Sequence, residues 1–358
     1  MSTFYDNADK VSEGLIKRGI DDRQRLLRNE AEDYLRAESL AIDERRPKLW
    51  KPDYSSEAAF LKSVEPNRQR WLQAVGDFGP EVDEGEPVIE PFLEDHRIEA
   101  WWITLPWRGN YRIRGVLGLP KQRAERLPLV IAQHGIGSDP EKVFGLTDAS
   151  GAYASFGRRL INDGFAVFAP MHVTGGGPRG RLERLCLMLG KKLWGLEINQ
   201  YARLLDYLQQ RPELDPERIG MWGLSLGGAY TLMTLPLEPR IKVGVSAAWF
   251  NHRVRKMVVD DPRHSCFLST TEEHVFIPNW LTEFSDSDLC ALIAPRAFMA
   301  QVGKCDGISW WPWVVEEFEV AQEHYDKLGV GEKIVLDLHE GGHEIHYEEG
   351  LDFLRRWL

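Results

Sequence analysis

The stretch that decides the fold is MWGLSLGGAY, residues 221–230. In it an apolar run ends in Ser225, with one glycine two positions before the serine and two glycines shortly after it. Glycine weakens the interior of a strand, so these glycines indicate a tight backbone turn rather than strand packing. The pattern G-x-S-x-G between a strand and a helix is typical of a turn that presents a nucleophilic serine. We therefore expect Ser225 to be a nucleophile at the end of a buried strand.

The chain around this turn alternates between strand and helix patterns. Continuous apolar runs at 127–135, 165–170 and 296–303 are typical of strands buried on both faces. Residues 199–212 carry leucines at helical spacing. Two strand-like runs joined by WRGN (107–110) predict an antiparallel hairpin before the alternation begins. This order predicts an α/β fold with a doubly wound, mostly parallel sheet.

Two regions do not fit this rhythm. Residues 1–82 are charged and helix-like, and we interpret them as an N-terminal helical segment before a catalytic domain at 83–358. Residues 251–292 form a long, polar, irregular insertion, which we expect to be lid-like and near the active site. Both regions are predicted to form walls of the substrate pocket.

Composition excludes several classes of function. The 358 residues carry a net charge of −11, which argues against nucleic-acid binding. No apolar stretch is long enough to cross a membrane, and the polar N-terminus lacks a secretory signal, so a cytoplasmic protein is expected. The four cysteines are scattered without metal spacing. We expect no metal, no cofactor and no membrane partner, only a small-molecule ester substrate, and homo-oligomer formation is left open.

A serine hydroxyl needs a base, and the base in turn needs an acid. His343 follows the last predicted strand on a Gly-Gly loop, where a base could reach Ser225. Asp306 follows the preceding strand, in the chain order serine, acid, histidine. Asp337 is the rival acid, but it lies within a strand pattern. We predict Ser225, Asp306 and His343 as the catalytic residues.

The oxyanion donors are expected to be backbone N–H groups. The helix after Ser225 places the N–H of Leu226 at its N-terminal end. HGIG (134–137) resembles an oxyanion loop, and Ile136 is the expected second donor, with Gly135 the weaker choice. His134 precedes the nucleophile in the chain, so we interpret it as structural rather than as the base.

Taken together, these motifs resemble α/β-hydrolases of the acetyl xylan esterase and dienelactone-hydrolase-like branch. The resemblance covers about residues 95–358 and assigns Ser225 as nucleophile, Asp306 as acid and His343 as base. Dienelactone hydrolases proper use cysteine, so their reaction is not expected here. Relatives carry aspartate where this chain has Met171 and Gln200, and the loop 171–186 is unusual, which leaves the substrate open.

The predicted function is a serine carboxylic-ester hydrolase for short-acyl, acetyl-like esters, with sugar esters among its candidates. Trp310, beside the predicted acid, and Trp249 and His252 are predicted to contact the substrate, because indoles suit flat rings and fill space that a long acyl chain needs. Two alternatives remain: a serine peptidase or C–C hydrolase with a helical cap, and a non-catalytic binding protein.

Overall fold

The computed structural model describes residues 12–123 and 125–358. A single nine-stranded mixed sheet organises the chain, in the order β1-β2-β3-β5-β4-β6-β7-β8-β9. The strands are β1 (Val88–Glu94), β2 (Ile98–Arg108), β3 (Tyr111–Pro120), β4 (Leu127–Gln133), β5 (Ala166–Pro170), β6 (Leu214–Leu224), β7 (Val243–Ala247), β8 (Ala297–Gly303) and β9 (Ile334–His339).

Only one edge of the sheet is antiparallel. β1, β2, β3 and β5 pair antiparallel in succession, whereas every pair from β5 through β4 to β9 is parallel. The central strands β5, β7 and β8 are buried along their whole length, as expected for strands covered on both faces. The predicted α/β fold with a doubly wound, mostly parallel sheet is confirmed.

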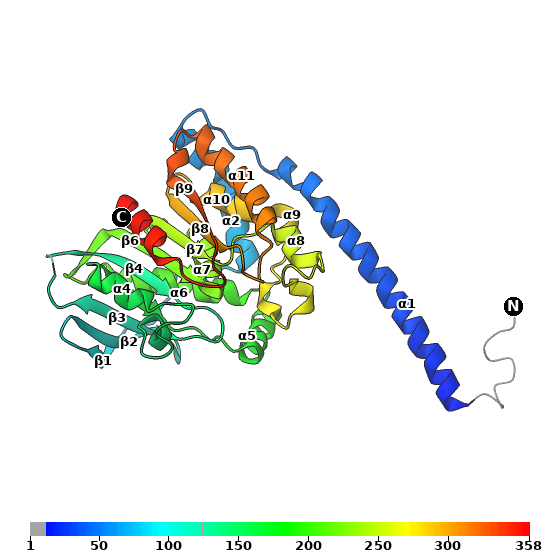
Figure 1. Ribbon diagram of the computed structural model, residues 1–358, viewed down its shortest axis with the longest axis horizontal. Helices are drawn as coiled ribbons and strands as arrows, with labels where there is room; N and C mark the ends of the chain where they lie inside the picture. Colours follow the sequence, from blue (N-terminus) through cyan, green and yellow to red (C-terminus); the bar gives the residue numbers. More distant parts are fainter. Residues whose placement is uncertain (1–11, 124) are drawn as a thin grey trace.

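Helices cover both faces of the sheet (Figure 1). The core on one face includes side chains from α2, α6, α7, α10 and α11, and the core on the other face includes α4 and α12. The helices are α1 (Glu13–Leu40), α2 (Glu57–Val75), α3 (Pro140–Val143), α4 (Phe156–Asn162), α5 (Gly176–Met188), α6 (Leu193–Leu208), α7 (Leu226–Thr234), α8 (Arg253–Val258), α9 (Trp280–Glu283), α10 (Asp286–Ile293), α11 (Trp311–Lys327) and α12 (Tyr347–Trp357).

The two N-terminal helices behave differently. α2 is part of the main body: Phe60 and Trp71 are fully buried, and the indole N–H of Trp71 donates to the carbonyl of Met233 on α7 (3.2 Å). α1 instead extends away from the body as a long arm (Figure 1). Within the described ranges, no helix is both long enough and apolar enough to span a lipid bilayer.

The insertion at 251–292 contains short helices rather than an unstructured loop. α8 opens it, α9 lies near its end, and α10 begins with a capping box in which Ser285 and Asp288 bond each other's backbone N–H groups. The buried guanidinium of Arg253 pairs with the buried carboxylate of Asp286, which joins the start of the insertion to α10. The segment 171–186, which was interpreted as an unusual loop from the sequence, is mostly helical in the structure, because most of it forms α5.

Candidate active site

The turn at Ser225 has a strained backbone. β6 ends at Leu224, α7 begins at Leu226, and Ser225 between them has φ 61° and ψ −120°. Its N–H donates to the carbonyl of Ala247 on β7 (2.8 Å), which fixes the turn against the neighbouring strand. A side chain at Gly223 or Gly227 would collide with backbone carbonyl groups. A positive φ at a residue other than glycine costs about 1–3 kcal/mol and is retained mostly where function needs it.

His343 and Asp306 form a hydrogen-bonded pair. Nδ1 of His343 lies 2.9 Å from Oδ2 of Asp306, and the other carboxylate oxygen accepts the N–H of Ile308 (2.9 Å). The carboxylate of Asp306 is buried, whereas the imidazole is 35% exposed. Because an ionised carboxylate only accepts, Nδ1 carries the proton and Nε2 is left as the basic nitrogen.

The loops that carry these two residues are joined by backbone hydrogen bonds. Asp306 lies just after β8, and His343 lies between β9 and α12. The N–H of Lys304 donates to the carbonyl of His339 (2.8 Å), and that of Cys305 donates to the carbonyl of Gly341 (2.9 Å). These two bonds extend the parallel pairing of β8 and β9 beyond the sheet and hold the acid beside the histidine.

Ser225 and His343 open into the same cavity, which has a volume of about 360 Å³ and which we call the Ser225 cavity. Its walls come from the loops after β4, β6, β7, β8 and β9 and from the insertion. The lining residues are Ile136, Gly137, Ser138, Lys142, Ala152, Tyr153, Leu224, Ser225, Leu226, Trp249, Lys256, Ser265, Phe267, Thr270, Glu272, Ile308 and His343. The insertion therefore contributes to the cavity. None of the described residues between 12 and 82 is in this lining, which differs from the expectation for the N-terminal helices.

Both predicted oxyanion donors line the Ser225 cavity. Leu226 is the first residue of α7, so its N–H is at the positive end of the helix and has no acceptor within that helix. Ile136 lines the same cavity from the loop after β4. The N–H of Gly135 is already donated to the hydroxyl of Tyr153 (2.6 Å), which leaves Ile136 as the better-placed donor of that loop.

Asp337 belongs to a second histidine–aspartate pair. Its Oδ2 lies 2.8 Å from Nδ1 of His346 and accepts the side-chain N–H of Gln301 (3.0 Å). Gln301 also donates to the backbone carbonyl of His346 (2.7 Å) and accepts the indole N–H of Trp222 (3.1 Å). Asp337 and His346 are not in the lining of the Ser225 cavity. This network fixes the start of α12 on the sheet.

His134 lies in the interior, away from the role of a base. It is fully buried, and burial lowers its pKa to about 4. Its Nδ1–H donates to the carbonyl of Gly135 (3.0 Å), and its Nε2 accepts the N–H of His172 (3.4 Å). A neutral imidazole that uses both nitrogens in this way supports the backbone before the oxyanion loop.

Of the three predicted substrate residues, only Trp249 is in the lining of the Ser225 cavity. Trp310 packs edge-on against Trp313 (5.0 Å between ring centroids) and under the guanidinium of Arg263 (3.7 Å). His252 is the residue before α8. Any role of Trp310 or His252 in substrate binding therefore needs a substrate that extends beyond this cavity.

The insertion supplies two charged residues of the cavity, Lys256 and Glu272, that were not predicted from the sequence. The ammonium of Lys256 is buried and donates to the carbonyl of Ser265, to its hydroxyl (2.7 Å) and to the carbonyl of Ile308 (2.7 Å). Burial, followed by the charge of Arg253, lowers the pKa of Lys256 to about 7. Burial raises the pKa of Glu272, against the opposing effect of Lys256. Because the insertion has no regular periodicity, the sequence holds no signal for either residue.

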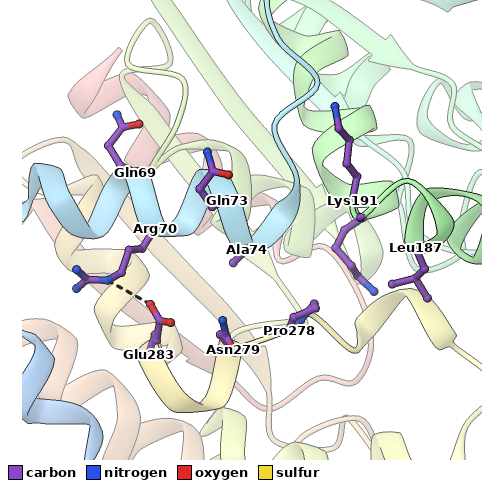
Figure 2. A pocket seen from close by; sticks show the side chains of 11 residues that line it. Gln69, Arg70, Gln73, Ala74, Leu187, Lys191, Pro278, Asn279 and Glu283 are labelled. Atoms are coloured by element: carbon purple, nitrogen blue, oxygen red, sulfur yellow. Dashed lines mark ion pairs between the residues drawn. The ribbon is translucent and has the colours of Figure 1, made fainter.

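A larger cavity, of about 560 Å³, lies between α2, the end of α5 and residues 278–283 (Figure 2). Most of its charged groups already have partners in the protein. Arg70 pairs with Glu283 (3.2 Å), and Lys192 pairs with the buried Glu183 and donates to the carbonyl of Phe276 (2.6 Å). No serine–histidine combination lines it, so its size does not make it a hydrolytic site. Within the described part of the chain, no group of three or more His, Cys, Asp or Glu side chains is arranged to hold a metal ion.

Comparison with known proteins gives three kinds of match. Residues 155–275 match the Prolyl oligopeptidase family. A relative from Bacillus subtilis, whose name is hydrolase YtaP, is 28% identical over 276 residues. These residues span 74% of this chain and 89% of that protein. The hydrolyase poxO of Penicillium oxalicum is 30% identical over 152 residues, which are 41% of this chain and 32% of that protein.

Solved structures match over most of the chain. A Bacteroides fragilis protein assigned as an acetyl xylan esterase superposes with a TM-score of 0.66 and 15% identity, covering 85% of this chain and 81% of that chain. A glucuronoyl esterase from Solibacter usitatus superposes with a TM-score of 0.62 and 14% identity, covering 84% and 93%. At such low identity, these likenesses establish a common fold and leave the substrate open.

Proposed function

We propose that this chain, an α/β-hydrolase with acetyl xylan esterases among its structural neighbours, is a serine carboxylic-ester hydrolase. The observation that carries the proposal is one constellation: Ser225 on its strained turn shares a cavity with His343, which is paired to Asp306. The names of the neighbours, which are esterases, support it.

The proposed reaction has two steps. In the first step, Oγ of Ser225 attacks the ester carbonyl while Nε2 of His343 takes the hydroxyl proton. The N–H groups of Leu226 and Ile136 stabilise the oxyanion that forms. Collapse of the tetrahedral intermediate releases the alcohol, which receives the proton from His343, and leaves an acyl-serine. In the second step His343 activates a water molecule, which hydrolyses the acyl-serine and regenerates Ser225. Asp306 keeps the imidazole in the tautomer that both steps need.

We propose short-acyl esters as the substrates. The Ser225 cavity holds about 360 Å³, which is small for a site that must take both the acyl and the alcohol group. Trp249 and Phe267 give it flat apolar walls, whereas Lys256 and Glu272 make the rest of it polar. Such a lining suits an acetyl group on a sugar or aromatic alcohol better than a fatty chain.

The test is a substrate panel with Ser225→Ala as the control. We expect kcat/KM to be higher for p-nitrophenyl acetate and propionate than for octanoate. Acetylated xylo-oligosaccharides test for hydrolysis of sugar acetyl esters, and a benzyl ester of glucuronic acid tests for hydrolysis of glucuronoyl esters. A kcat/KM that rises steadily from acetate to octanoate would overturn the short-acyl proposal. No Ser225-dependent hydrolysis of any ester would overturn the esterase proposal itself.

One observation favours a second candidate, an aminoacyl or peptide hydrolase. Glu272 places a partly buried carboxylate in the Ser225 cavity, where it could bind the amino group of a substrate. The match to the Prolyl oligopeptidase family supports this reading. Aminoacyl p-nitroanilides test it. Ser225-dependent cleavage that Glu272→Gln abolishes, while p-nitrophenyl acetate is still hydrolysed, would favour the peptidase over the esterase.

A further inference from the structure

Among the residues that the structure describes, the arm formed by α1 has few contacts outside the helix itself. It is 28 residues long, or about 42 Å at 1.5 Å per residue, and Gly19 is its one buried residue among those described. Its C-terminal half contacts α8, and its N-terminal half points away from the body (Figure 1). Helices in proteins are stabilised mainly by packing an apolar face, so an arm of this length calls for a partner.

Three exposed apolar side chains of α1 lie on the side of the helix opposite the residue that contacts the body. Ile20, Leu27 and Tyr34 are spaced by seven residues, which places them along one side of the helix, and they are 45%, 61% and 64% exposed. Arg36 makes a contact with the body. It lies two positions after Tyr34, which is about 200° further around the helix. It donates to the carbonyl of Val258 and pairs with Asp260 (2.6 Å). The stripe Ile20-Leu27-Tyr34 therefore lies opposite the docked face.

Charge is distributed unevenly along α1, and this distribution indicates what covers the stripe. Residues 13–28 have five basic and three acidic side chains, a net charge of +2, whereas residues 29–40 have one basic and four acidic side chains, a net charge of −3. Two copies of α1 laid antiparallel bring each positive half against a negative half. A parallel pair would instead align like charges, which is destabilising.

We propose that α1 is a self-association arm that pairs antiparallel with α1 of a second copy of this chain. An isologous contact of this kind has a two-fold axis, which passes near Leu27. Ile20 then packs on Tyr34 of the second copy, because both are equally far from Leu27 along the helix. Lys17, ten positions before Leu27, comes within one position of Glu38 of the second copy, which is eleven positions after Leu27. This inference goes beyond the proposed ester hydrolysis and does not depend on it.

The test is the oligomeric state of the full-length chain by sedimentation velocity between about 1 and 100 μM. We expect a dimer for the native sequence. Leu27→Glu should raise the dissociation constant more than about tenfold, because it places a charge in the apolar contact. Lys17→Glu and Glu38→Lys should each weaken the dimer about three- to tenfold. Lys17 and Glu38 are too far apart to touch within one helix, so recovery of the dimer in the double variant K17E/E38K can come only from contact between copies.

Asn29→Ala is the matched control, since Asn29 lies on the side of α1 opposite Leu27 and its replacement leaves the charge of the helix unchanged, so the dissociation constant should not change. Circular dichroism and the melting temperature measure folding in every variant, so the test does not depend on the proposed hydrolysis. A monomeric native chain at 100 μM overturns the proposal. A dimer unaffected by Leu27→Glu, or single charge variants without recovery in the double variant, overturns it as well.

Discussion

Nζ of Lys256 lies 2.7 Å from the carbonyl oxygen of Ile308, the residue whose N–H is donated to Asp306. The insertion is thereby bonded to the loop of the proposed acid. Ser265 adds a second link, because its N–H donates to the carbonyl of Gly307 (2.9 Å). The charged lysine can donate to all three of its acceptors, and the neutral amine can donate to the two carbonyls and accept from the hydroxyl of Ser265. Loss of the proton therefore need not break this contact.

The pH dependence of stability tests this arrangement. The pKa of Lys256 is about 7 in the folded protein, below its ordinary value of 10.5, so between these values the unfolded chain binds more protons. Lys256 then adds up to about 1.4 kcal/mol to the free energy of unfolding for each unit that the pH rises in this window. Urea unfolding at pH 7.5 and pH 9 should show that rise in the native chain and less of it in Lys256→Met. Lys327→Met, at an exposed lysine, is the control, and equal slopes in all three proteins would contradict the lowered pKa.

Replacing the proposed nucleophile should abolish turnover without unfolding the protein. Ser225→Ala is expected to lower kcat at least ~10³-fold, because no other hydroxyl takes over the attack. A fluorophosphonate should label Ser225 alone, as read by mass spectrometry. Ser246→Ala is the matched control: Ser246 is buried and donates to the carbonyl of Gly228 (2.8 Å), so its loss should cost about 1 kcal/mol of stability and leave kcat intact. Full activity in Ser225→Ala would refute the mechanism.

The two histidine–aspartate pairs allow a direct comparison of acids. Asp306→Asn should lower kcat by about 10⁴-fold, because an amide no longer holds His343 in the basic tautomer. Asp337→Asn should keep most of the activity per folded molecule, since its partner His346 is outside the Ser225 cavity. Steady-state kinetics on both variants, corrected for the folded fraction, decides the matter. The reverse ranking would show that Asp337 is the functional acid.

The proposed oxyanion loop leaves no room for a side chain at Gly135. A methyl group at Gly135 would lie 2.9 Å from the carbonyl oxygen of Leu224 and 3.0 Å from both Cβ of Ser225 and the hydroxyl of Tyr153. Gly135→Ala should therefore push the loop away from the nucleophile and lower kcat by about 10- to 100-fold with little change in KM. Gly177→Ala, where the new methyl group meets nothing within 4 Å, should be silent. An active Gly135→Ala enzyme would place the oxyanion donors elsewhere.

Much of the sheet could be predicted because its central strands have a strong signal. β5 and β8 are continuous apolar runs between clear breaks, and the glycines around Ser225 mark its turn. β1 was not predicted, because Pro91 lies in its middle and most of its side chains are exposed. A proline is tolerated there only because β1 is an edge strand that pairs on one side with β2.

α5 was missed for a different reason. Its glycines and Pro178 favour a loop locally, and the helix is held by a distant contact. The buried Arg179 donates to both carboxylate oxygens of Glu197 on α6 (2.8 and 3.0 Å). Lys256 and Glu272 were missed in the same way, since only the folded insertion brings them to Ser225. Asp306 could be chosen over Asp337 from its place after a strand, but the pairing of Asp337 with His346 could not be foreseen.

The burial of α2 has a consequence for the way in which the chain can be cut. Phe60, Val64 and Trp71 fill the core beneath α7, α10 and α11, whereas α1 touches the body mainly through Arg36. A protease acting on the native protein should therefore clip the chain after Leu40 and before Trp50, whose indole is part of the core and donates to the carbonyl of Glu283 (2.9 Å). The clipped product should retain its hydrolytic turnover and its melting temperature, because the residues that it loses lie outside the core. A cut after Val75 should have a different outcome, because removal of Trp71 would leave an exposed apolar groove on the rest of the chain. The remaining chain should then aggregate.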